Sequence, residues 1–173
     1  MTVWDTTGLA PEDQPRFEYV NREQIPNELK EVFDSIVGSQ RGVGTLSNGA
    51  LPGPFNGWMY TDPEMARALD SIGMAIRLNT TNVPKAMKEV AICVIGAHFR
   101  SNVEFWAHSR IALAAGVRQD VLDSIYHGEK PSFIDSEEER RQKAAYNMAG
   151  EYLRNYRVSD ETYQAVLDRL GSE

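Results

Sequence analysis

Residues 84–116 read PKAMKEVAICVIGAHFRSNVEFWAHSRIALAAG, and this stretch decides the fold that the sequence predicts. Pro84 is a typical first residue of a helix, and the residues after Glu89 are apolar on nearly every side of that helix. A helix that is apolar all round belongs in the centre of a bundle. Asn102 is a good N-cap for a second helix, and Gly116 is a typical left-handed residue at its end. We therefore expect a central helix that is followed directly by a second helix.

The rest of the chain shows the same helical periodicity. No alternation of apolar and polar residues is long enough for a strand, and there is no internal repeat. We therefore predict an all-α protein with six or seven helices. The further helices are expected between Pro26 and Gly38, from Asp62 to about Leu78, from about Gln119 to Tyr126, from Ser136 to about Tyr156, and from Ser159 to Gly171.

The domain organisation follows from length and punctuation. The 173 residues are close to the usual size of one domain, about 150 residues. Residues 1–25 are charged, contain two prolines and lack periodicity, so we expect an N-terminal surface arm followed by a single domain over 26–173. Residues 40–57, QRGVGTLSNGALPGPFNG, are too rich in glycine and proline for a regular element. Ordered loops of this length are often functional.

Charge and composition exclude several classes of partner. Lys and Arg number 18 and Asp and Glu 25, so the formal net charge is −7. An acidic chain without clustered basic residues lacks the electrostatic footprint of a nucleic-acid binder, and anionic membrane surfaces repel it. The first residues, MTVWDTTGLAPEDQ, are polar and acidic, so we expect no secretory signal and a cytoplasmic protein. No apolar run reaches the roughly 18 residues of a membrane span.

Metal ions and cofactors also find no support in the sequence. The single cysteine, Cys93, excludes an internal disulfide, a CxxC pair and a cysteine-built zinc site, and its apolar helix favours a structural role. Glu104 and His108 have Glu-x-x-x-His spacing, whereas di-iron helices carry Glu-x-x-His. The chain has no HExxH, P-loop, GxGxxG or GxSxG motif. We expect neither a metal nor a cofactor.

Glu104 and His108 are the first candidates for chemistry. They lie four positions apart on one expected helix, so their side chains reach each other, and Ser101 precedes them by about one turn. A carboxylate beside an imidazole is the minimum equipment for general acid–base catalysis. The alternative is an exposed pair worth a few tenths of a kcal/mol. The apolar neighbours of the pair favour the functional interpretation.

Glu89 and His98 are less specific on the residues alone. Glu89 can be explained as an acid near the start of a helix, and His98 as a satisfied core histidine. His98 follows Glu89 by nine positions, which is a net rotation of about 180° on a straight helix. The two side chains therefore face opposite ways and share a pocket only if the helix breaks or another subunit contributes.

With these residues in view, residues 84–128 resemble the carboxymuconolactone decarboxylase family of the alkylhydroperoxidase D-like superfamily. Gly53-Pro54-Phe55, an Asp-Pro helix start and the capping box near Ser136 extend the similarity over most of residues 26–170. The segments that carry the resemblance are Glu89-Val-Ala-Ile, Ala97-His98-Phe99-Arg100, Glu104-Phe-Trp-Ala-His108 and Ala112-Leu-Ala-Ala-Gly116.

One departure from the superfamily decides which branch the chain is similar to. Peroxidase members carry cysteines seven and four residues before the histidine, and here Ser101 and Glu104 stand at those positions. Neither side chain can form the disulfide of a thiol peroxidase cycle. The remaining set of Glu89, Glu104 and His108 suits the cofactor-free decarboxylase branch.

The resemblance implies an alkylhydroperoxidase D-like helical bundle that assembles into homo-trimers or hexamers, which would cover exposed apolar helix faces. It implies a cofactor-independent lyase that decarboxylates or isomerises a small oxygenated acid or lactone. Glu104 and His108, supported by Glu89, are its expected catalytic residues. Two alternatives stay open. One is another cofactor-free reaction such as hydration, lactone opening or cyclisation, and the other is a non-catalytic ligand-binding or scaffold protein of the same fold.

Five further residues are predicted to bind the substrate. Arg100 can hold a substrate carboxylate through bidentate hydrogen bonds. Phe55 and Trp58, on the glycine-rich loop, are candidates for the apolar wall of the pocket, with simple packing of the loop as the alternative. His98 and Ser101 complete this set.

Overall fold

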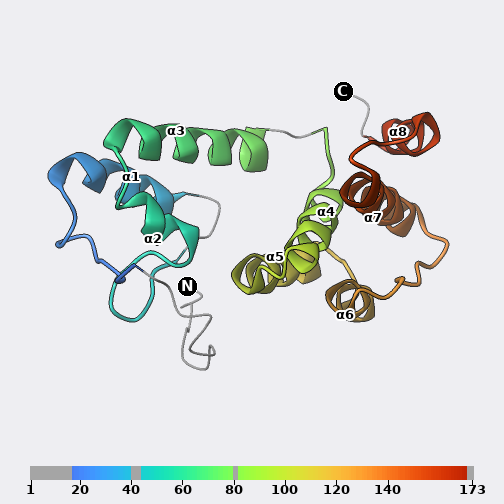
Figure 1. The fold of residues 1–173 in the computed structure, drawn as a ribbon, viewed down its shortest axis with the longest axis horizontal. Helices are drawn as coiled ribbons and strands as arrows, with labels where there is room; N and C mark the ends of the chain where they lie inside the picture. Colours follow the sequence, from blue (N-terminus) through green and yellow to red (C-terminus); the bar gives the residue numbers. More distant parts are fainter. Residues whose placement is uncertain (1–16, 40–43, 80–81, 171–173) are drawn as a thin grey trace. The chain divides into compact units, whose positions relative to one another are not determined.

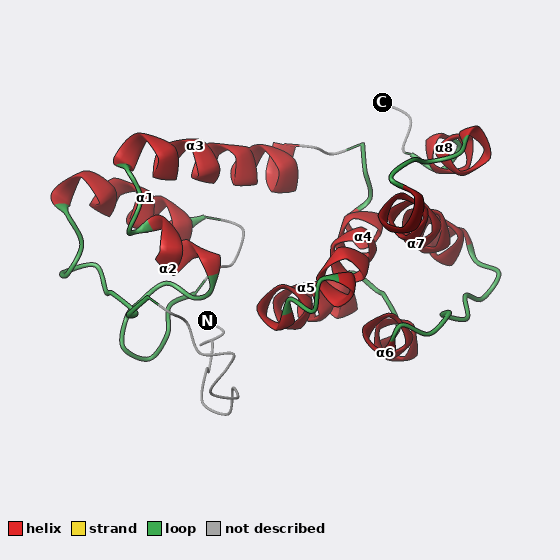
Figure 2. Ribbon diagram, in the orientation of Figure 1, coloured by secondary structure: helices red, strands yellow, loops and turns green. Residues whose placement is uncertain are grey.

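The structure is a computed structural model that describes residues 17–39, 44–79 and 82–170. Within these residues every regular element is a helix, and an isolated bridge between Asn21 and Ala50 is the one strand-type pairing (Figure 2). The all-α prediction is confirmed for this part of the chain. The helices are α1 (Asn27–Gly38), α2 (Pro54–Trp58), α3 (Pro63–Met74), the π-helix η2 (Ala75–Asn79), α4 (Lys85–His98), α5 (Asn102–Ala114), α6 (Gln119–His127), α7 (Glu137–Asn155) and α8 (Asp160–Leu167) (Figure 1).

The described residues contain eight α-helices, whereas six or seven were expected. The additional element is α2, a short helix inside the glycine-rich segment that was predicted to be irregular. Proline stands at its first position, where the fixed φ angle of this residue type suits a helix start. No helix in the described ranges is long and apolar enough to span a bilayer.

The chain divides into two compact units, Met1–Thr80 and Thr81–Glu173, and the single domain predicted over 26–173 spans both. In the first unit α1 packs against α3. The apolar positions of α1 recur at helical spacing and face a common core with Ile25, Leu51, Met59 and Ala66. Residues 17–25, the described end of the predicted arm, join this unit.

Asn56 attaches the described end of the arm to the first unit. Its side chain is buried, accepts a hydrogen bond from Val20 N at 3.1 Å and donates one to the carbonyl of Glu18 at 3.0 Å. An amide that pairs with backbone on both sides is satisfied in the interior. Residues 18–20 are therefore held against α2.

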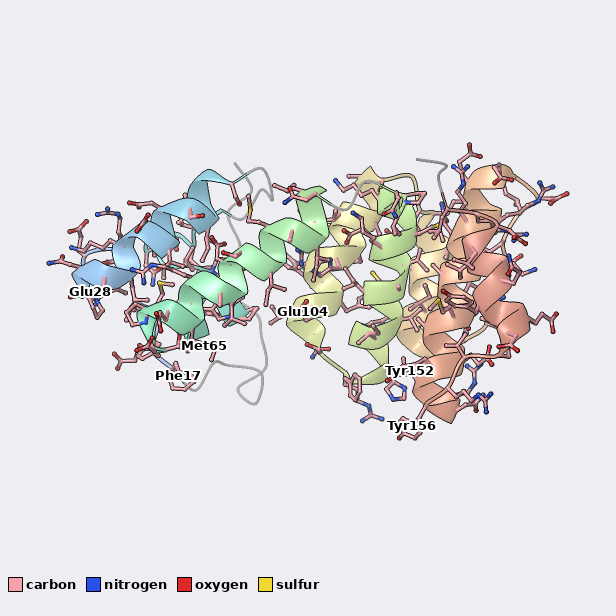
Figure 3. The ribbon with its side chains drawn as sticks, turned by 90° about the horizontal axis from the view of Figure 1, so that it is seen from above. Phe17, Glu28, Met65, Glu104, Tyr152 and Tyr156 are labelled. Carbon is pink, nitrogen blue, oxygen red and sulfur yellow. The ribbon has the colours of Figure 1, made fainter. Side chains whose placement is uncertain are left out.

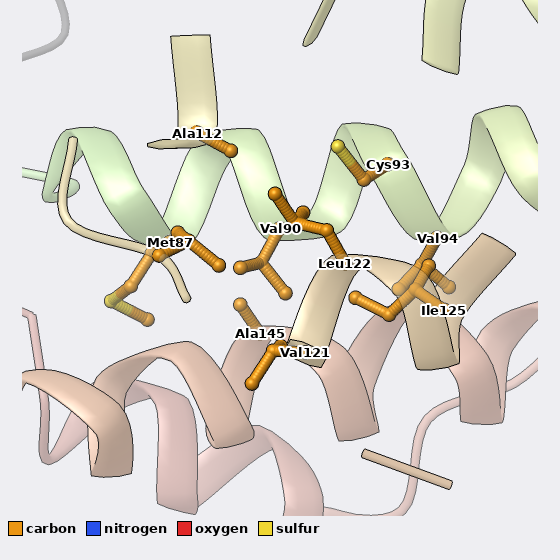
Figure 4. Packing of buried hydrophobic residues seen from close by; sticks show 10 residues of the cluster. Met87, Val90, Cys93, Val94, Ala112, Val121, Leu122, Ile125 and Ala145 are labelled. Atoms are coloured by element: carbon orange, nitrogen blue, oxygen red, sulfur yellow. The ribbon is translucent and has the colours of Figure 1, made fainter. Parts of the chain in front are cut away.

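In the second unit α4 packs against α5, α6 and α7, and α8 packs against α7. The central position predicted for this apolar helix is confirmed within the unit. Figure 4 shows the core from close by, with side chains of α4 meeting those of the surrounding helices. The fully or nearly buried members of the cluster are Met87, Val90, Cys93, Val94, Ala112, Val117, Val121, Leu122, Ile125 and Ala145.

A tight turn between α4 and α5 brings these two helices side by side. Ser101 N donates to the carbonyl of Gly96 at 2.8 Å and Arg100 N to that of Ala97 at 3.1 Å, which is the Schellman pattern of a helix end. Gly96 also permits the close approach, because a Cβ there would lie 3.3 Å from Phe105 N. The turn reverses the chain and returns α5 along α4.

The connection into α7 rests on Glu139 and Arg118. The Ser136 hydroxyl accepts from Glu139 N at 3.2 Å, which confirms the N-cap of the predicted capping box. The Glu139 carboxylate does not complete the box. It accepts from Arg118 Nε at 2.8 Å and from Ile134 N at 2.7 Å, and so ties α7 to the residue before α6.

Candidate functional site

The closest polar contact of the candidate site joins α4 to α5. Oε2 of Glu89 lies 2.6 Å from Nδ1 of His108, and the two residues are only 5% and 3% exposed. The close packing of α4 and α5 brings them together although 19 positions separate them in sequence. An ionised carboxylate only accepts hydrogen bonds, so Nδ1 of His108 is the donor in this contact when Glu89 is ionised.

Glu104 completes the site on the other side of the imidazole. Its Oε2 lies 3.5 Å from Nε2 of His108, and its side chain is 41% exposed. The proximity expected from the spacing of four residues is therefore observed. The imidazole of His108 lies between two carboxylates, of which the inner one is buried and the outer one is open to solvent.

This arrangement can move a proton between the outside of the unit and a buried group. With Nδ1 bonded to Glu89, the second ring nitrogen of His108 is the one directed to Glu104. A proton that arrives on this nitrogen makes an imidazolium between two carboxylates, and a buried charge needs such pairing. The three residues thus form a short chain of proton acceptors that ends at solvent.

The helix-dipole explanation for Glu89 does not fit its position. α4 begins at Lys85, and its first turn contains no acidic residue. Glu89 lies beyond that turn and is buried against α5, where the helix N-terminus contributes little. Its contact with His108 is therefore the interaction that accounts for a carboxylate at this place.

Cys93 lies one turn after Glu89 and is fully buried in the core. Burial, with a further contribution from the Glu89 carboxylate, raises the pKa of this thiol to about 12. Cys93 is therefore a thiol at neutral pH and behaves as a small apolar side chain, as the sequence predicts. Ser101 is half-buried at the residue before α5 and makes no capping hydrogen bond.

His98 and Arg100 lie at the C-terminal end of α4, and both are exposed. The alternative of a core histidine is therefore wrong for His98. Both residues line a groove formed with α6 and α7, and none of Glu89, Glu104 and His108 lines it. That His98 and Arg100 contact the substrate of the acid–base residues stays a prediction.

Phe55 and Trp58 belong to the first unit. Their rings meet edge to face with centroids 4.8 Å apart, and both pack against the core of that unit. The packing that was the alternative explanation is thus observed. Their role as a wall of the substrate pocket stays a prediction.

His127 and Arg154, which were not among the predicted site residues, line the same groove as His98 and Arg100. All three helices that meet at this groove carry a basic residue in their last turn, namely His98, His127 and Arg154. This shared feature is visible in the sequence. The sequence does not show that the three helix ends converge, because their convergence depends on the packing of α4, α6 and α7.

No protein-family model, curated protein or solved structure matches the chain. Across the described ranges, no group of three or more His, Cys, Asp and Glu side chains is arranged to hold a metal ion.

Proposed function

We propose that the protein is a cofactor-independent lyase of the carboxymuconolactone decarboxylase type, acting on a small oxygenated acid or lactone. The observation that carries the proposal is the buried contact of 2.6 Å between Glu89 and His108, with Glu104 on the solvent side of the same imidazole. Paired titratable groups in such surroundings are typical of sites that transfer protons.

Exposure distinguishes the roles of the three residues. The side chain of Glu104 is 41% exposed, whereas those of His108 and Glu89 are 4% and 7% exposed. Glu104 is therefore the group that meets the substrate and exchanges a proton with it. His108 exchanges that proton with Glu104, and Glu89 holds the ring in the required tautomer and orientation.

Decarboxylation needs such a proton donor. The bond between the carboxylate carbon and its neighbour breaks, carbon dioxide leaves, and the electron pair stays on the neighbouring carbon beside the carbonyl of the lactone or acid. That carbon then takes one proton from Glu104, which regains it from solvent or through His108. An isomerisation uses the same groups, because the proton removed from one carbon is returned to another. A positioned acid–base group of this kind contributes about 10²–10⁴-fold to the rate.

The proposal includes the alkylhydroperoxidase D-like bundle and its homo-trimeric or hexameric assembly. Large apolar side chains are exposed on or beside α4 and α5, and a subunit contact would cover them. These side chains are Ile95, Phe99, Trp106 and Leu113.

The test is to incubate the protein with carboxymuconolactone and with related β-keto and lactone acids, and to follow carbon dioxide release by mass spectrometry. Glu104→Gln and His108→Ala are expected to lower turnover by about 10²-fold or more. Glu138→Gln is the matched control, because it makes the same chemical change at an exposed position of α7. It should leave turnover unchanged.

Thermal unfolding of each variant separates loss of chemistry from loss of fold. The Glu104 side chain is partly exposed and the substitution keeps its size, so Glu104→Gln should unfold at nearly the temperature of the parent protein. Full turnover in Glu104→Gln would contradict its assigned role. If none of the tested acids loses carbon dioxide, the decarboxylase proposal fails. If Glu104→Gln or His108→Ala changes only the affinity for one of these acids, the protein is a binding protein.

A further inference from the structure

A hollow of the Thr81–Glu173 unit lies where α4, α6 and α7 end. It is an open groove of about 410 Å³, which is within the range of small-molecule sites. The acid–base residues do not line it. Its polar lining includes His98, Arg100, His127, Arg154, Tyr126 and Tyr146. Tyr152 and Tyr156, labelled in Figure 3, mark the end of α7 beside which the groove forms.

Among the described residues, no carboxylate forms an ion pair with either arginine of this groove, although the charge of Arg154 helps to lower the pKa of the Glu151 carboxyl group. Elsewhere in the described residues, arginines pair closely with acids, as Arg22 does with Asp34 at 2.6 Å and Arg118 with Glu139 at 2.8 Å. In the part of the chain that the structure describes, neither Arg100 nor Arg154 forms an ion pair, although the chain carries a net charge of −7.

The glycine at position 150 makes room for the guanidinium of Arg154. Both residues line the groove, and a Cβ at Gly150 would lie 3.0 Å from Nη1 of Arg154. The guanidinium therefore lies back along α7, over the place where other residues carry a side chain. This position keeps the charge at the groove.

Arg100 occupies a backbone position that usually belongs to glycine. Its φ angle is +52°, in the left-handed region that costs a residue with a side chain about 1–2 kcal/mol. Glycine would end α4 without this cost. The structure thus keeps a strained residue where its side chain lines the groove beside Arg154.

Helix dipoles explain part of this charge pattern. Basic residues in the last turn interact favourably with a helix C-terminus, and His98, His127 and Arg154 have such positions. The dipoles do not explain the hollow between these residues. They also do not explain why neither guanidinium forms an ion pair within the described residues. Only one carboxylate, that of Glu129, lines the groove.

We propose that this groove binds a small organic anion, through a carboxylate or phosphate group held by Arg100 and Arg154. The planar guanidinium presents parallel N–H donors that match the oxygens of both groups. Tyr126 and Tyr146 supply aromatic surface for the rest of the ligand. The site is independent of the proposed acid–base chemistry, so Glu104→Gln leaves anion binding intact.

Isothermal titration calorimetry at low ionic strength tests the proposal on the full chain. The probes are inorganic phosphate, benzoate and benzamide, which has the shape of benzoate without its charge. Arg100→Gln and Arg154→Gln remove one charge each and keep most of the side-chain length. Arg140→Gln is the matched control, because Arg140 lies on α7 outside the groove and pairs with Asp135.

At least one of the two anions is expected to bind, benzamide is not, and added salt should weaken binding because the groove is open. Each groove variant should weaken binding about tenfold or more, with no change in Arg140→Gln. Phosphate binding without benzoate binding assigns the site to phosphate ligands, and the reverse assigns it to carboxylates. The proposal is overturned if neither anion binds, or if both groove variants bind as the parent does. If a second copy of the chain covers the groove instead, these variants should lose self-association and neither anion should bind. This result also overturns the proposal.

Discussion

Glu89 Oε2 and His108 Nδ1 lie 2.6 Å apart in the interior of the second unit, across the contact between α4 and α5. Hydrogen bonds to an ionised partner are shorter and about twice as strong as neutral ones. The packing of α4 against α5 therefore has two effects. It buries the side chains of Glu89 and His108, and it orients the imidazole for the candidate chemistry.

Removal of the Glu89 carboxylate should leave the imidazole of His108 without its inner partner. We expect Glu89→Ala to lower the free energy of unfolding by about 1–3 kcal/mol, the usual cost of an unsatisfied buried group. Urea unfolding measures this change. In proton NMR the parent should show a downfield, slowly exchanging imidazole N–H resonance that the variant lacks. The same resonance in Glu89→Ala would show that another group holds His108. Glu89→Gln keeps an acceptor oxygen and should retain most of the stability.

A side chain at Gly96 should separate α4 from α5. The added Cβ of Gly96→Ala would meet Phe105 N at 3.3 Å, and overpacking of this kind costs about 1–3 kcal/mol. Gly38→Ala is the matched control, because it also lies in a helix and a Cβ there meets nothing within 4 Å. The control should be neutral or stabilising by up to about 1 kcal/mol. Equal thermal midpoints for the two variants would contradict the close approach at Gly96.

Cys93 should resist alkylation as long as the protein is folded. Burial keeps its pKa near 12, so the reactive thiolate is scarce at pH 8, and the side chain is inaccessible. Iodoacetamide treatment followed by mass spectrometry should show modification only after guanidinium chloride is added. Rapid modification of the native protein would show that the core around Cys93 opens readily.

Glu151 should make the attachment of α8 depend on pH. Hydrogen bonds from Thr162 and from Ser159 N, the latter at 2.9 Å, lower the pKa of its carboxyl group below the usual 4.5. A lowered pKa means that the stabilisation is present above about pH 4.5 and is lost as the pH falls through the lowered value. Glu151→Gln should therefore unfold at a lower temperature than the parent at pH 7, with a difference that shrinks below pH 4. A constant difference at all pH values would contradict this assignment.

Most helices could be predicted from local features. Pro63 after the N-cap Asp62, the hydroxyl of Ser136 and the hydroxyl of Ser159 mark helix starts that the structure confirms. The helix α2 was missed because its five residues are too few for periodicity and lie among glycines and prolines. A helix cap involves residues only a few positions apart, and so it can be predicted from the sequence.

The candidate site was only partly predictable. Glu104 and His108 share one helix, so their proximity follows from the helical repeat. The burial of Glu89 against His108 and the exposure of His98 were not visible locally. The first depends on the close packing of α4 and α5, and the second on how α6 and α7 pack around the end of α4.

By itself, the sequence determined the helical class, the central place of α4 in its unit and the pairing of Glu104 with His108. Each of these depends on periodicity, capping or hydrophobicity over a single turn or a single helix. Only the tertiary structure decided that Glu89 closes on His108 and that Arg100 and Arg154 share a groove. These contacts join residues far apart in sequence. They depend on how helix surfaces fit together, and no single helix carries that information.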